Sequence, residues 1–313
     1  MKILISDKMS NKVEDVLKSK QINFDIKTGM SPEELKEVID QYDGILIRSA
    51  TKLTSDILAD CKNLKVIGRA GVGVDNVDLD QATKNKILVM NTPLGNLEAT
   101  AELSVGLMFS LMRNIHLAND STHQGKWEKP KFIGTELKGK TLGIVGYGNI
   151  GQRVAEICST IGMNIITNSK SASDEDLSRF KAKKVSTEQL IKEADIVSIH
   201  TKLNDETKYM FNKETLSTMK PTSVIINCAR GGLINEEDLK DALNNEVIAG
   251  AAIDVYENEP ATDNVMFGAK NLLLTPHLGA SSKEAQSNVA IDVANQVADF
   301  LIDNKIVNNV NSF

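Results

Sequence analysis

The stretch TLGIVGYGNIG, residues 141–151, decides the fold of this sequence, because an apolar run leads directly into three glycines spaced as GxGxxG. A segment of helical character, QRVAEICSTIG, follows it. In this order a strand, a glycine turn and a helix bind a pyrophosphate: the glycines permit the tight turn, the close approach of the ligand and the packing of helix on strand. A tight turn without a ligand is the alternative. The residues predicted to bind a dinucleotide here are Gly146, Gly148, Asn149, Ile150 and Gly151.

Short β-branched runs alternate with helical segments on both sides of this motif. Strands are predicted at 141–145, 163–167, 194–199, 223–227, 249–255 and 271–275. Before the motif, strands are predicted near residues 4 and 25 and at 44–48, 65–69 and 87–91. Such alternation is typical of βαβ units in parallel sheets. We therefore predict the α/β class with two doubly wound domains, a Rossmann-type domain inserted into a flavodoxin-like one.

Two longer helices complete this prediction. Apolar residues recur at every fourth position between Glu98 and His116, which indicates one long helix. Ser281 and Glu284 fit a capping box at the start of a terminal helix. The apolar stripe of that helix consists of Val289, Val293, Val297 and Leu301. We expect this helix to complete the first domain, so that the substrate domain comprises 1–93 and 282–313 and the dinucleotide-binding domain comprises 94–281.

The composition excludes several classes of function. The net charge is −6 and no long basic run occurs, which disfavours nucleic acid and anionic membranes as partners. Three scattered cysteines are too few for a disulfide framework. No apolar stretch approaches the roughly 20 residues of a membrane span, and no targeting segment is visible. We expect a cytoplasmic protein with no membrane partner and no metal site.

Polar side chains follow three predicted strands in the dinucleotide-binding half. Arg230 ends SVIINCAR, Glu259 lies shortly after AGAAIDV, and His277 follows NLLLTP. In doubly wound sheets, ligands bind outside the carboxyl ends of the strands. One such residue alone is more often structural, but these three have complementary chemistry: arginine grips a carboxylate, histidine exchanges a proton, and glutamate stabilises the imidazolium. The set predicts hydride transfer at a 2-hydroxy acid.

The strand predicted at 163–167 ends without the acidic residue that usually binds the ribose hydroxyls about 20 positions after the glycine turn. The residues there are Asn168, Ser169, Lys170 and Ser171. None of them repels a 2′-phosphate, and Lys170 with the serines could donate hydrogen bonds to one. We hypothesise that Ser169 and Lys170 contact the cofactor and that NADP(H) is tolerated or preferred. Asp174 and Asp176 are interpreted as solvated loop charges.

Two arginines end predicted strands in the first half, Arg48 after GILI and Arg69 after KVIG. Two arginines at strand ends in one domain suggest a dianionic substrate, because paired guanidinium groups bind a phosphate well. The turn Gly71-Val72-Gly73 follows, and it can present successive backbone N–H groups to a carboxylate. A plain β-turn is the alternative. We predict that Val72 and Gly73 bind substrate with the two arginines.

Several stretches resemble the D-isomer-specific 2-hydroxyacid dehydrogenase family, and within it most closely the phosphoglycerate dehydrogenases. These stretches are RSATKLT (48–54), IGRAGVGVDNVDLD (67–80), NTPLGN (91–96), GTELKGKTLGIVGYGNIG (134–151), NCARGGLINEEDL (227–239), AAIDVYENEP (251–260) and TPHLGASSKEAQ (275–286). The resemblance covers essentially the whole chain.

The resemblance implies a role for each matched residue. Arg230, Glu259 and His277 correspond to the family's catalytic set, with His277 as general base in oxidation. Asp254 and Ala229 correspond to positions beside the nicotinamide, and His200 and Thr201 to positions around the cofactor, which in this family is NAD. Lys202 stands where the family often has proline, which affects the shape of that loop. Asn96 is added to the substrate-binding set, and Lys129 matches more loosely a basic residue that reaches a neighbouring subunit's site.

The implied reaction is the oxidation of 3-phospho-D-glycerate to 3-phosphooxypyruvate, the first step of serine biosynthesis. Two alternatives stay open: another member of the family, such as a glyoxylate or hydroxypyruvate reductase, and a non-catalytic dinucleotide-sensing protein. The resemblance also implies a homodimer or higher homo-oligomer formed through the dinucleotide-binding domain, with the helix from Glu98 as the expected contact. The predicted domains account for all 313 residues, so no appended regulatory domain is expected.

Overall fold

The structure, a computed structural model that describes residues 1–313, divides the chain into two units. Unit 1 comprises Met1–Leu97 and Ala280–Phe313, and unit 2 comprises Glu98–Gly279. The domain boundaries predicted after residues 93 and 281 lie a few residues from these. No helix combines the length and apolar character that spanning a membrane requires.

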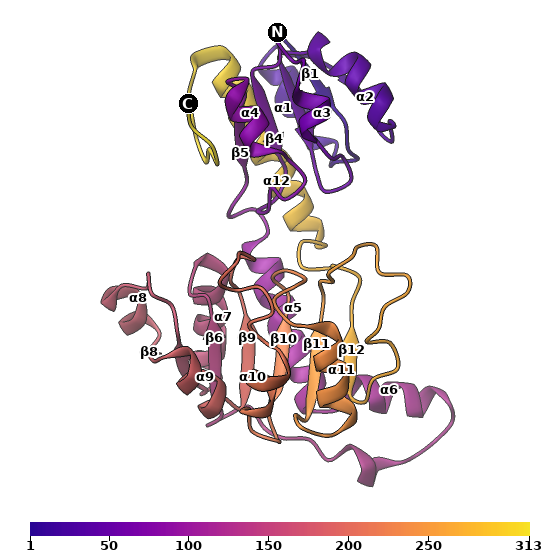
Figure 1. The fold of residues 1–313 in the computed structure, drawn as a ribbon, viewed down its shortest axis with the longest axis vertical. Coiled ribbons are helices and arrows are strands. Elements are labelled where there is room, and N and C mark those ends of the chain that lie inside the picture. The colour runs from indigo at the N-terminus through magenta and orange to yellow at the C-terminus, as the bar shows by residue number, and fades with distance from the viewer. The chain divides into compact units, whose positions relative to one another are not determined.

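Unit 1 carries both ends of the chain (Figure 1). It contains a five-stranded parallel sheet with the order β2-β1-β3-β4-β5, which is the flavodoxin-like order. Its strands are β1 (Lys2–Ile5), β2 (Asn23–Ile26), β3 (Gly44–Ile47), β4 (Val66–Arg69) and β5 (Leu88–Asn91). Its helices are α1 (Lys12–Ser19), α2 (Pro32–Val38), η1 (Ile39–Gln41), α3 (Ser55–Leu58), α4 (Leu79–Lys84) and α12 (Lys283–Asp303).

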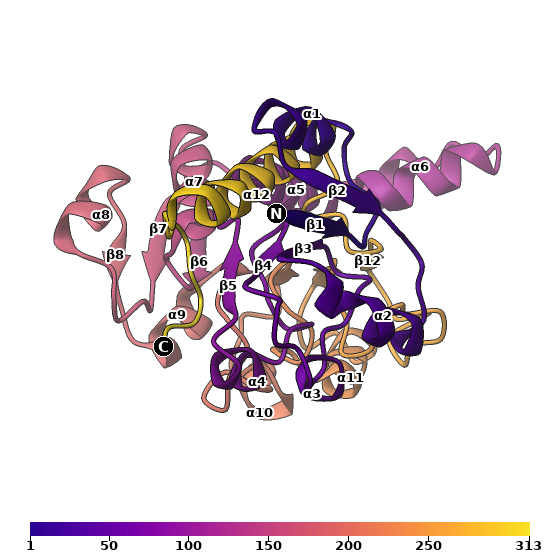
Figure 2. The same cartoon turned by 90° about the horizontal axis from the view of Figure 1, so that it is seen from above.

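Helices cover both faces of this sheet, because successive residues of a strand point to opposite sides. Leu46 packs in the cluster formed with α1 and α12, whereas Ile45 and Ile47 pack in the cluster formed with α2, α3 and α4. Figure 2 shows α12 beside α1, and the two helices are in contact. Gly68 lets α12 approach β4, since a Cβ there would lie 2.5 Å from a Val297 methyl group.

The terminal helix confirms one prediction and corrects another. Val289, Val293 and Val297 are buried in unit 1, and Leu301 is partly buried against the same cluster. The predicted capping box is wrong, because the N-cap is Ser282, whose hydroxyl accepts from the Ala285 amide. The helix therefore begins one residue later than the S-x-x-E pattern indicated, and its third residue is an alanine.

Unit 2 contains a seven-stranded parallel sheet with the order β12-β11-β10-β9-β6-β7-β8. The six strands from β8 to β11 have the Rossmann order, and β12 extends the edge. The strands are β6 (Thr141–Val145), β7 (Asn164–Thr167), β8 (Lys183–Lys184), β9 (Ile196–Ile199), β10 (Val224–Asn227), β11 (Gly250–Ile253) and β12 (Leu272–Leu274). The fold class predicted from the sequence is confirmed.

Helices again cover both faces (Figure 1). They are α5 (Leu97–Met112), α6 (Ile115–His123), η2 (Lys129–Phe132), α7 (Asn149–Thr160), α8 (Asp174–Arg179), α9 (Thr187–Glu193), α10 (Lys213–Ser217) and α11 (Glu236–Asn244). Residues of α5 and α7 share one core cluster with Leu142 and Ile144 of β6. Residues of α9, α10 and α11 share the other with Ile199 and Ile225.

Two local predictions are wrong, and one strand was not predicted. The single helix expected from Glu98 to His116 is two helices, because Asn114 adopts a left-handed conformation with φ 52° between α5 and α6. Asp174 and Asp176 are not loop charges: they lie in the first turn of α8, where Asp176 and Ser173 form a capping box. The short edge strand β8 was not predicted, because two lysines carry no apolar pattern.

Candidate active site

The carboxyl ends of three neighbouring strands bring the predicted acid–base residues together. Asn227 of β10 pairs with Ile253 of β11, and Ile253 pairs with Leu274 of β12, so these strands end at the same level. Arg230, Asp254, Glu259 and His277 all lie just beyond these ends. The sheet therefore gathers side chains that are up to 47 positions apart in the sequence.

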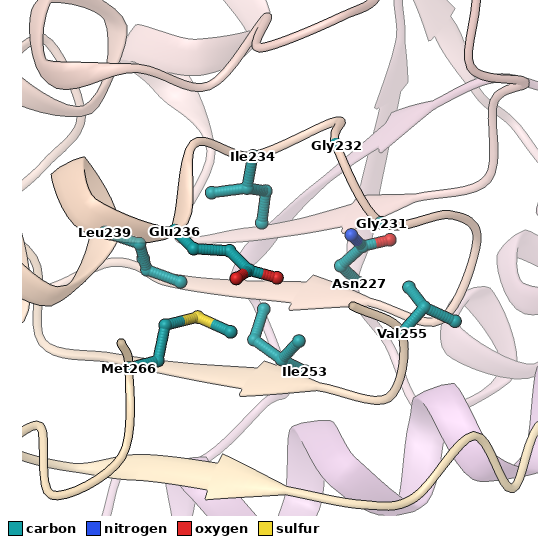
Figure 3. Close-up of a pocket in the computed structure, with 9 residues that line it drawn as sticks. All are labelled: Asn227, Gly231, Gly232, Ile234, Glu236, Leu239, Ile253, Val255 and Met266. Carbon is teal, nitrogen blue, oxygen red and sulfur yellow. The ribbon is translucent and has the colours of Figure 1, made fainter. Parts of the chain in front are cut away.

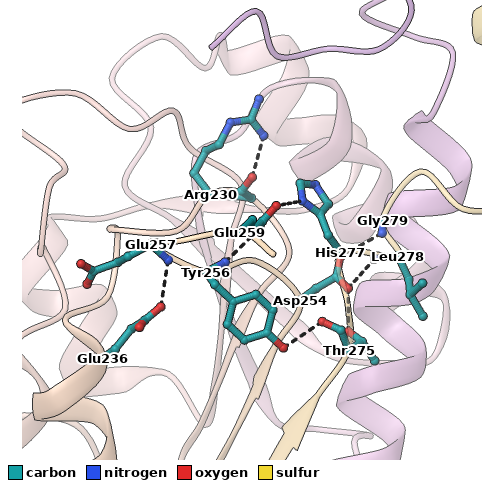
Figure 4. Close-up of polar contacts among 11 residues, drawn as sticks. Arg230, Glu236, Asp254, Tyr256, Glu257, Glu259, Thr275, His277, Leu278 and Gly279 are labelled. Carbon is teal, nitrogen blue, oxygen red and sulfur yellow. Dashed lines mark hydrogen bonds and ion pairs between the residues drawn. The ribbon is translucent and has the colours of Figure 1, made fainter. Parts of the chain in front are cut away.

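The central contact is a histidine–carboxylate pair (Figure 4). His277 Nδ1 lies 2.6 Å from Glu259 Oε2, and Glu259 Oε1 accepts a hydrogen bond from the Tyr256 amide at 3.0 Å. The His277 side chain is 49% exposed. Because Glu259 engages Nδ1, the Nε2 atom is the one available to exchange a proton with a ligand.

The surroundings of Glu259 keep its carboxyl group ionised. Burial alone would raise its pKa, but the hydrogen bonds from His277 and from the Tyr256 amide, with the charges of His277 and Arg230, outweigh burial. The pKa of Glu259 is therefore lowered from its ordinary value. A carboxylate that stays charged stabilises the protonated form of its imidazole partner.

Arg230 follows β10 in a turn that the Asn227 side chain holds. Asn227 Nδ2 donates to the Arg230 carbonyl at 2.8 Å, and its Oδ1 accepts from the Ala229 amide at 3.0 Å. The Arg230 guanidinium donates to the Ala229 carbonyl at 2.7 Å (Figure 4). Gly231 is pressed against the segment that leads to Glu259, since a Cβ there would lie 1.9 Å from the Tyr256 carbonyl oxygen. The turn thus holds Arg230 on the side of the Glu259 carboxylate.

Asp254 is fully buried and binds the turn that carries His277 (Figure 4). Its Oδ1 accepts from the Thr275 hydroxyl and the Leu278 amide, both at 2.6 Å, and its Oδ2 accepts from the Gly279 amide at 2.8 Å. His277 itself has a left-handed backbone, with φ 53°. The resemblance placed Asp254 beside the nicotinamide; its contacts in the structure are with this turn.

The glycine turn between β6 and α7 has the geometry of an anion site. Gly146 has φ 90°, and a Cβ at Gly151 would lie 2.2 Å from the Gly146 carbonyl oxygen, so both positions require glycine. Gly148 differs, because a Cβ there would meet nothing within 4 Å. The backbone is therefore open above the N-terminus of a twelve-residue helix, where a pyrophosphate fits.

His200 and Thr201 pack against this turn through their backbone. A Cβ at Gly146 would lie 2.6 Å from the His200 carbonyl oxygen and 2.8 Å from the Thr201 nitrogen. The His200 imidazole is turned to the protein, with Nε2 2.8 Å from the Ser198 hydroxyl. Burial lowers the pKa of His200 to about 4, so the ring is neutral at physiological pH.

The loop after β7 carries hydroxyl and ammonium groups where many such sites carry a carboxylate. Ser169 Oγ lies 3.4 Å from Ser171 Oγ, and Asn168 Nδ2 donates to the Thr187 hydroxyl at 3.0 Å. The Lys170 side chain is 94% exposed, and its Nζ lies 3.8 Å from Glu206 Oε2. The loop that follows β7 therefore consists of the residues that the sequence analysis expected there, and none of residues 168–171 is acidic.

In unit 1, Arg48 and Arg69 lie at the ends of the neighbouring strands β3 and β4, which pair at Ile47 and Arg69. The Arg69 guanidinium lies against Gly71, where a Cβ would be 1.7 Å from its Nη1. The Gly71 amide donates to the Thr92 hydroxyl at 2.7 Å, so that N–H is not available to a ligand. The predicted anion turn is therefore reduced to Val72 and Gly73, and Asn96 lies next to the start of α5.

A small cavity lies behind the Arg230 turn, lined by Asn227, Gly231, Ile253 and neighbouring residues (Figure 3). Its volume is about 10 Å³, roughly the space of one water molecule, so it holds neither a dinucleotide nor an organic acid.

Residues 105–279 match the family model described as D-isomer specific 2-hydroxyacid dehydrogenase, NAD binding domain. The chain belongs to the D-isomer-specific 2-hydroxyacid dehydrogenase family. It is 44% identical to the D-3-phosphoglycerate dehydrogenase of Synechocystis over 301 residues, which are 96% of this chain and 54% of that protein. The chain spans about half the length of the curated relatives it matches.

Two solved structures show the same fold as this family member. The NAD⁺-bound 3-phosphoglycerate dehydrogenase of Entamoeba histolytica has a TM-score of 0.84 and 29% identity, covering 100% of this chain and 99% of that one. An acyclic imino acid reductase in complex with NADPH and D-Arg has a TM-score of 0.90 and 28% identity, covering 99% and 100%. The family resemblance drawn from the sequence motifs is confirmed.

The structure adds three residues to the site of this family member that the sequence pattern did not single out. Asn227 holds the Arg230 turn, while Thr275 and Tyr256 bind Asp254 and Glu259. Asn227 and Thr275 end or follow strands, the same signal that identified Arg230 and His277. Tyr256 acts through its backbone amide, which no sequence pattern reveals.

Proposed function

We propose that this chain oxidises 3-phospho-D-glycerate to 3-phosphooxypyruvate with a nicotinamide dinucleotide, the first step of serine biosynthesis. The oxidoreductase activity is supported by the His277–Glu259 pair, which lies beside Arg230 at the strand ends of an NAD-binding domain. The substrate part is supported by the curated relatives that are named D-3-phosphoglycerate dehydrogenase.

The side chains of this site divide the chemistry among them. His277 Nε2 accepts the proton of the C2 hydroxyl group, and Glu259 stabilises the imidazolium that forms. Arg230 binds the carboxylate of the hydroxy acid and polarises the oxygen on C2 as it becomes a carbonyl. A nicotinamide held at the glycine turn would supply the hydride acceptor for C2. Asp254 acts through His277, because its three hydrogen bonds hold the turn.

The glycine turn supplies the cofactor site in this proposal. Gly146, Gly148 and Gly151 shape it, and the amides of Asn149 and Ile150 begin the helix whose positive end faces the pyrophosphate. Thr201 adjoins Gly146 and Ala229 adjoins Arg230, so both belong to the surroundings of the dinucleotide.

Arg48 and Arg69 are proposed to bind the substrate phosphate. The amides of Val72 and Gly73 and the Asn96 side chain are proposed to contact the substrate beside them. Their position at neighbouring strand ends supports this assignment, as does the fit of a guanidinium fork to phosphate. We expect Arg48→Ala and Arg69→Ala to raise KM for 3-phospho-D-glycerate far more than KM for D-lactate.

A substrate panel tests this function. Purified protein is assayed with 3-phospho-D-glycerate, D-lactate and D-glycerate in oxidation, and with glyoxylate and hydroxypyruvate in reduction, using NAD(H) and NADP(H). The proposal predicts the highest kcat/KM for 3-phospho-D-glycerate. Preferred reduction of glyoxylate or hydroxypyruvate would assign the chain to another branch of the family, and absence of all turnover would favour a dinucleotide sensor.

We also propose that the chain forms a homodimer or a higher homo-oligomer through unit 2. Phe109, Ile115, Leu117, Trp127 and Ile133 of α5, α6 and the following segment are exposed apolar side chains. Exposed apolar side chains gathered on neighbouring segments mark protein interfaces. Light scattering of wild type and Leu117→Asp tests the assembly: the proposal predicts a smaller species for the variant, whereas a monomeric wild type contradicts it.

The compartment proposed for the chain is the cytoplasm. Cys61, Cys158 and Cys228 are free and buried, which suits a reducing compartment. Localisation of a tagged chain by fluorescence checks this.

A further inference from the structure

The edge strand β8 places a lysine beside the cofactor loop. Lys184 pairs with Thr167, the last residue of β7. The Thr167 hydroxyl donates to the Ile144 carbonyl of β6 at 2.8 Å, which ties this strand end to the one that enters the glycine turn. Lys184 is therefore next to the strand end at which a Rossmann fold binds the adenosine ribose.

The Lys184 ammonium group joins the loop that follows β7. Its Nζ donates to the Lys170 carbonyl at 3.1 Å. The same loop carries the Lys170 ammonium group and the two hydroxyls of Ser169 and Ser171, which are 3.4 Å apart. The loop of residues 169–171 thus carries two hydroxyl groups and one ammonium group, and Lys184 of β8 adds a second ammonium group to it. A carboxylate at this position would instead repel a 2′-phosphate.

The neighbouring carboxylates do not cancel this charge. Glu206 lies 3.8 Å from Lys170, but the two side chains are 82% and 94% exposed, and such a surface pair is weak. The Asp176 carboxylate accepts from the Ser173 amide and hydroxyl in the cap of α8. Lys184 makes no ion pair in the structure.

We propose that Lys184, with Lys170, Ser169 and Ser171, binds a phosphate on the 2′-oxygen of the adenosine ribose, so that this chain prefers NADP(H) to NAD(H). The inference rests on the proposed function only for the dinucleotide site, because the 2′-phosphate is remote from the nicotinamide and takes no part in hydride transfer. The spacing of residues along the sequence could not reveal the role of Lys184, because Lys184 lies on a separate strand, β8.

Binding of two fragments tests the site without turnover. Calorimetric titration compares adenosine 2′,5′-bisphosphate with 5′-AMP, which differ only in the 2′-phosphate, and fluorescence titration compares NADPH with NADH. We expect wild type to bind the 2′-phosphorylated member of each pair at least roughly tenfold more tightly, and Lys184→Ala to lose roughly 10- to 100-fold for that member, as removal of a charge-assisted hydrogen bond predicts. Binding of 5′-AMP should not change.

Lys183→Ala is the matched control, because Lys183 is the neighbouring residue of β8 and its side chain leaves the strand on the other side. It should bind all four ligands as wild type does. Lys184→Glu provides a second variant and should favour NADH over NADPH. Equal binding of both members of each pair by wild type, or an equal loss for Lys183→Ala and Lys184→Ala, would overturn the inference.

The two proposals fail independently. Turnover of 3-phospho-D-glycerate by a protein that does not discriminate the fragments retains the function and removes the 2′-phosphate site. Discrimination of the fragments without turnover retains the site and removes the function.

Discussion

Replacing Gly148 by alanine separates the two explanations of the glycine turn, a dinucleotide site and a tight turn without a ligand. Gly148 is the N-cap of α7, has φ −78°, and has open space where a Cβ would project. Alanine is a poorer N-cap than glycine by up to about 1 kcal/mol. Alanine also restricts the backbone of the unfolded chain, which stabilises the folded protein by roughly 0.4–1 kcal/mol. The free energy of unfolding should therefore stay within about 1 kcal/mol of wild type.

The effect on binding should be much larger. The added methyl group would stand where the pyrophosphate approaches the backbone amides of α7. Loss of one charge-assisted hydrogen bond costs about 1.5–3 kcal/mol, so the affinity for the reduced dinucleotide should fall roughly 10- to 100-fold.

Fluorescence titration with NADH and NADPH and urea denaturation of the same samples measure the two quantities. Gly106→Ala is the control for an added methyl group, because it also faces open space in unit 2 and should leave binding unchanged. Gly146→Ala is the contrast: φ 90° and the His200 carbonyl oxygen 2.6 Å from a Cβ predict a loss of about 2 kcal/mol or more in unfolding free energy. Unchanged dinucleotide binding by Gly148→Ala would refute the site, and destabilisation equal to that of Gly146→Ala would refute the geometric reasoning.

Three further outcomes follow from the contacts of the site. Asp254→Asn places an amide NH2 group among three hydrogen-bond donors, so it should lower kcat and reduce the free energy of unfolding by about 1–3 kcal/mol in denaturation. The affinity for NADH should change less than about threefold. A loss confined to NADH affinity would instead place Asp254 beside the nicotinamide. Glu259→Gln should lower kcat and move the pH–rate profile to lower pH, because a neutral partner no longer stabilises the His277 imidazolium. The control Glu257→Gln should change neither quantity. An unmoved profile in Glu259→Gln would show that Glu259 does not stabilise the imidazolium. The His200 imidazole has a pKa of about 4 in the folded protein, whereas in the unfolded chain it takes up a proton near pH 6.5. As the pH falls from 6.5 to 4, the free energy of unfolding of wild type should therefore decrease by roughly 3 kcal/mol more than that of His200→Asn in denaturation. Parallel stability curves for the two proteins would contradict the burial of the imidazole.

The sequence was sufficient wherever one strand and its own end carry the information. Uninterrupted runs such as GILI and TLGIV became strands because both faces of each sheet are covered by helices. Arg230 and His277 could be found because a polar residue after such a run lies at the ligand edge of the sheet. The break at Asn114 was missed because the apolar spacing of α5 continues across it into α6.

Contacts between separate strand ends could not be read in the same way. The hydrogen bonds of Asp254 depend on the register of β11 with β12, and the position of Lys184 depends on β8 pairing with β7. The spacing along the chain indicated that the carboxylate that usually binds the ribose hydroxyls is missing. It did not indicate that the Lys184 side chain contacts the loop after β7. The use of the Gly71 amide by Thr92 likewise depends on the neighbouring strands β4 and β5.

We propose that His277 accepts the proton in the oxidation of a phosphorylated hydroxy acid. The most direct measurement is the initial rate of nicotinamide reduction with saturating 3-phospho-D-glycerate, in wild type, His277→Ala and the control His123→Ala, with dinucleotide affinity determined for each. We expect kcat to fall by about 10²-fold or more in His277→Ala alone, with the affinity for the dinucleotide retained. Turnover by His277→Ala at the wild-type rate would contradict it.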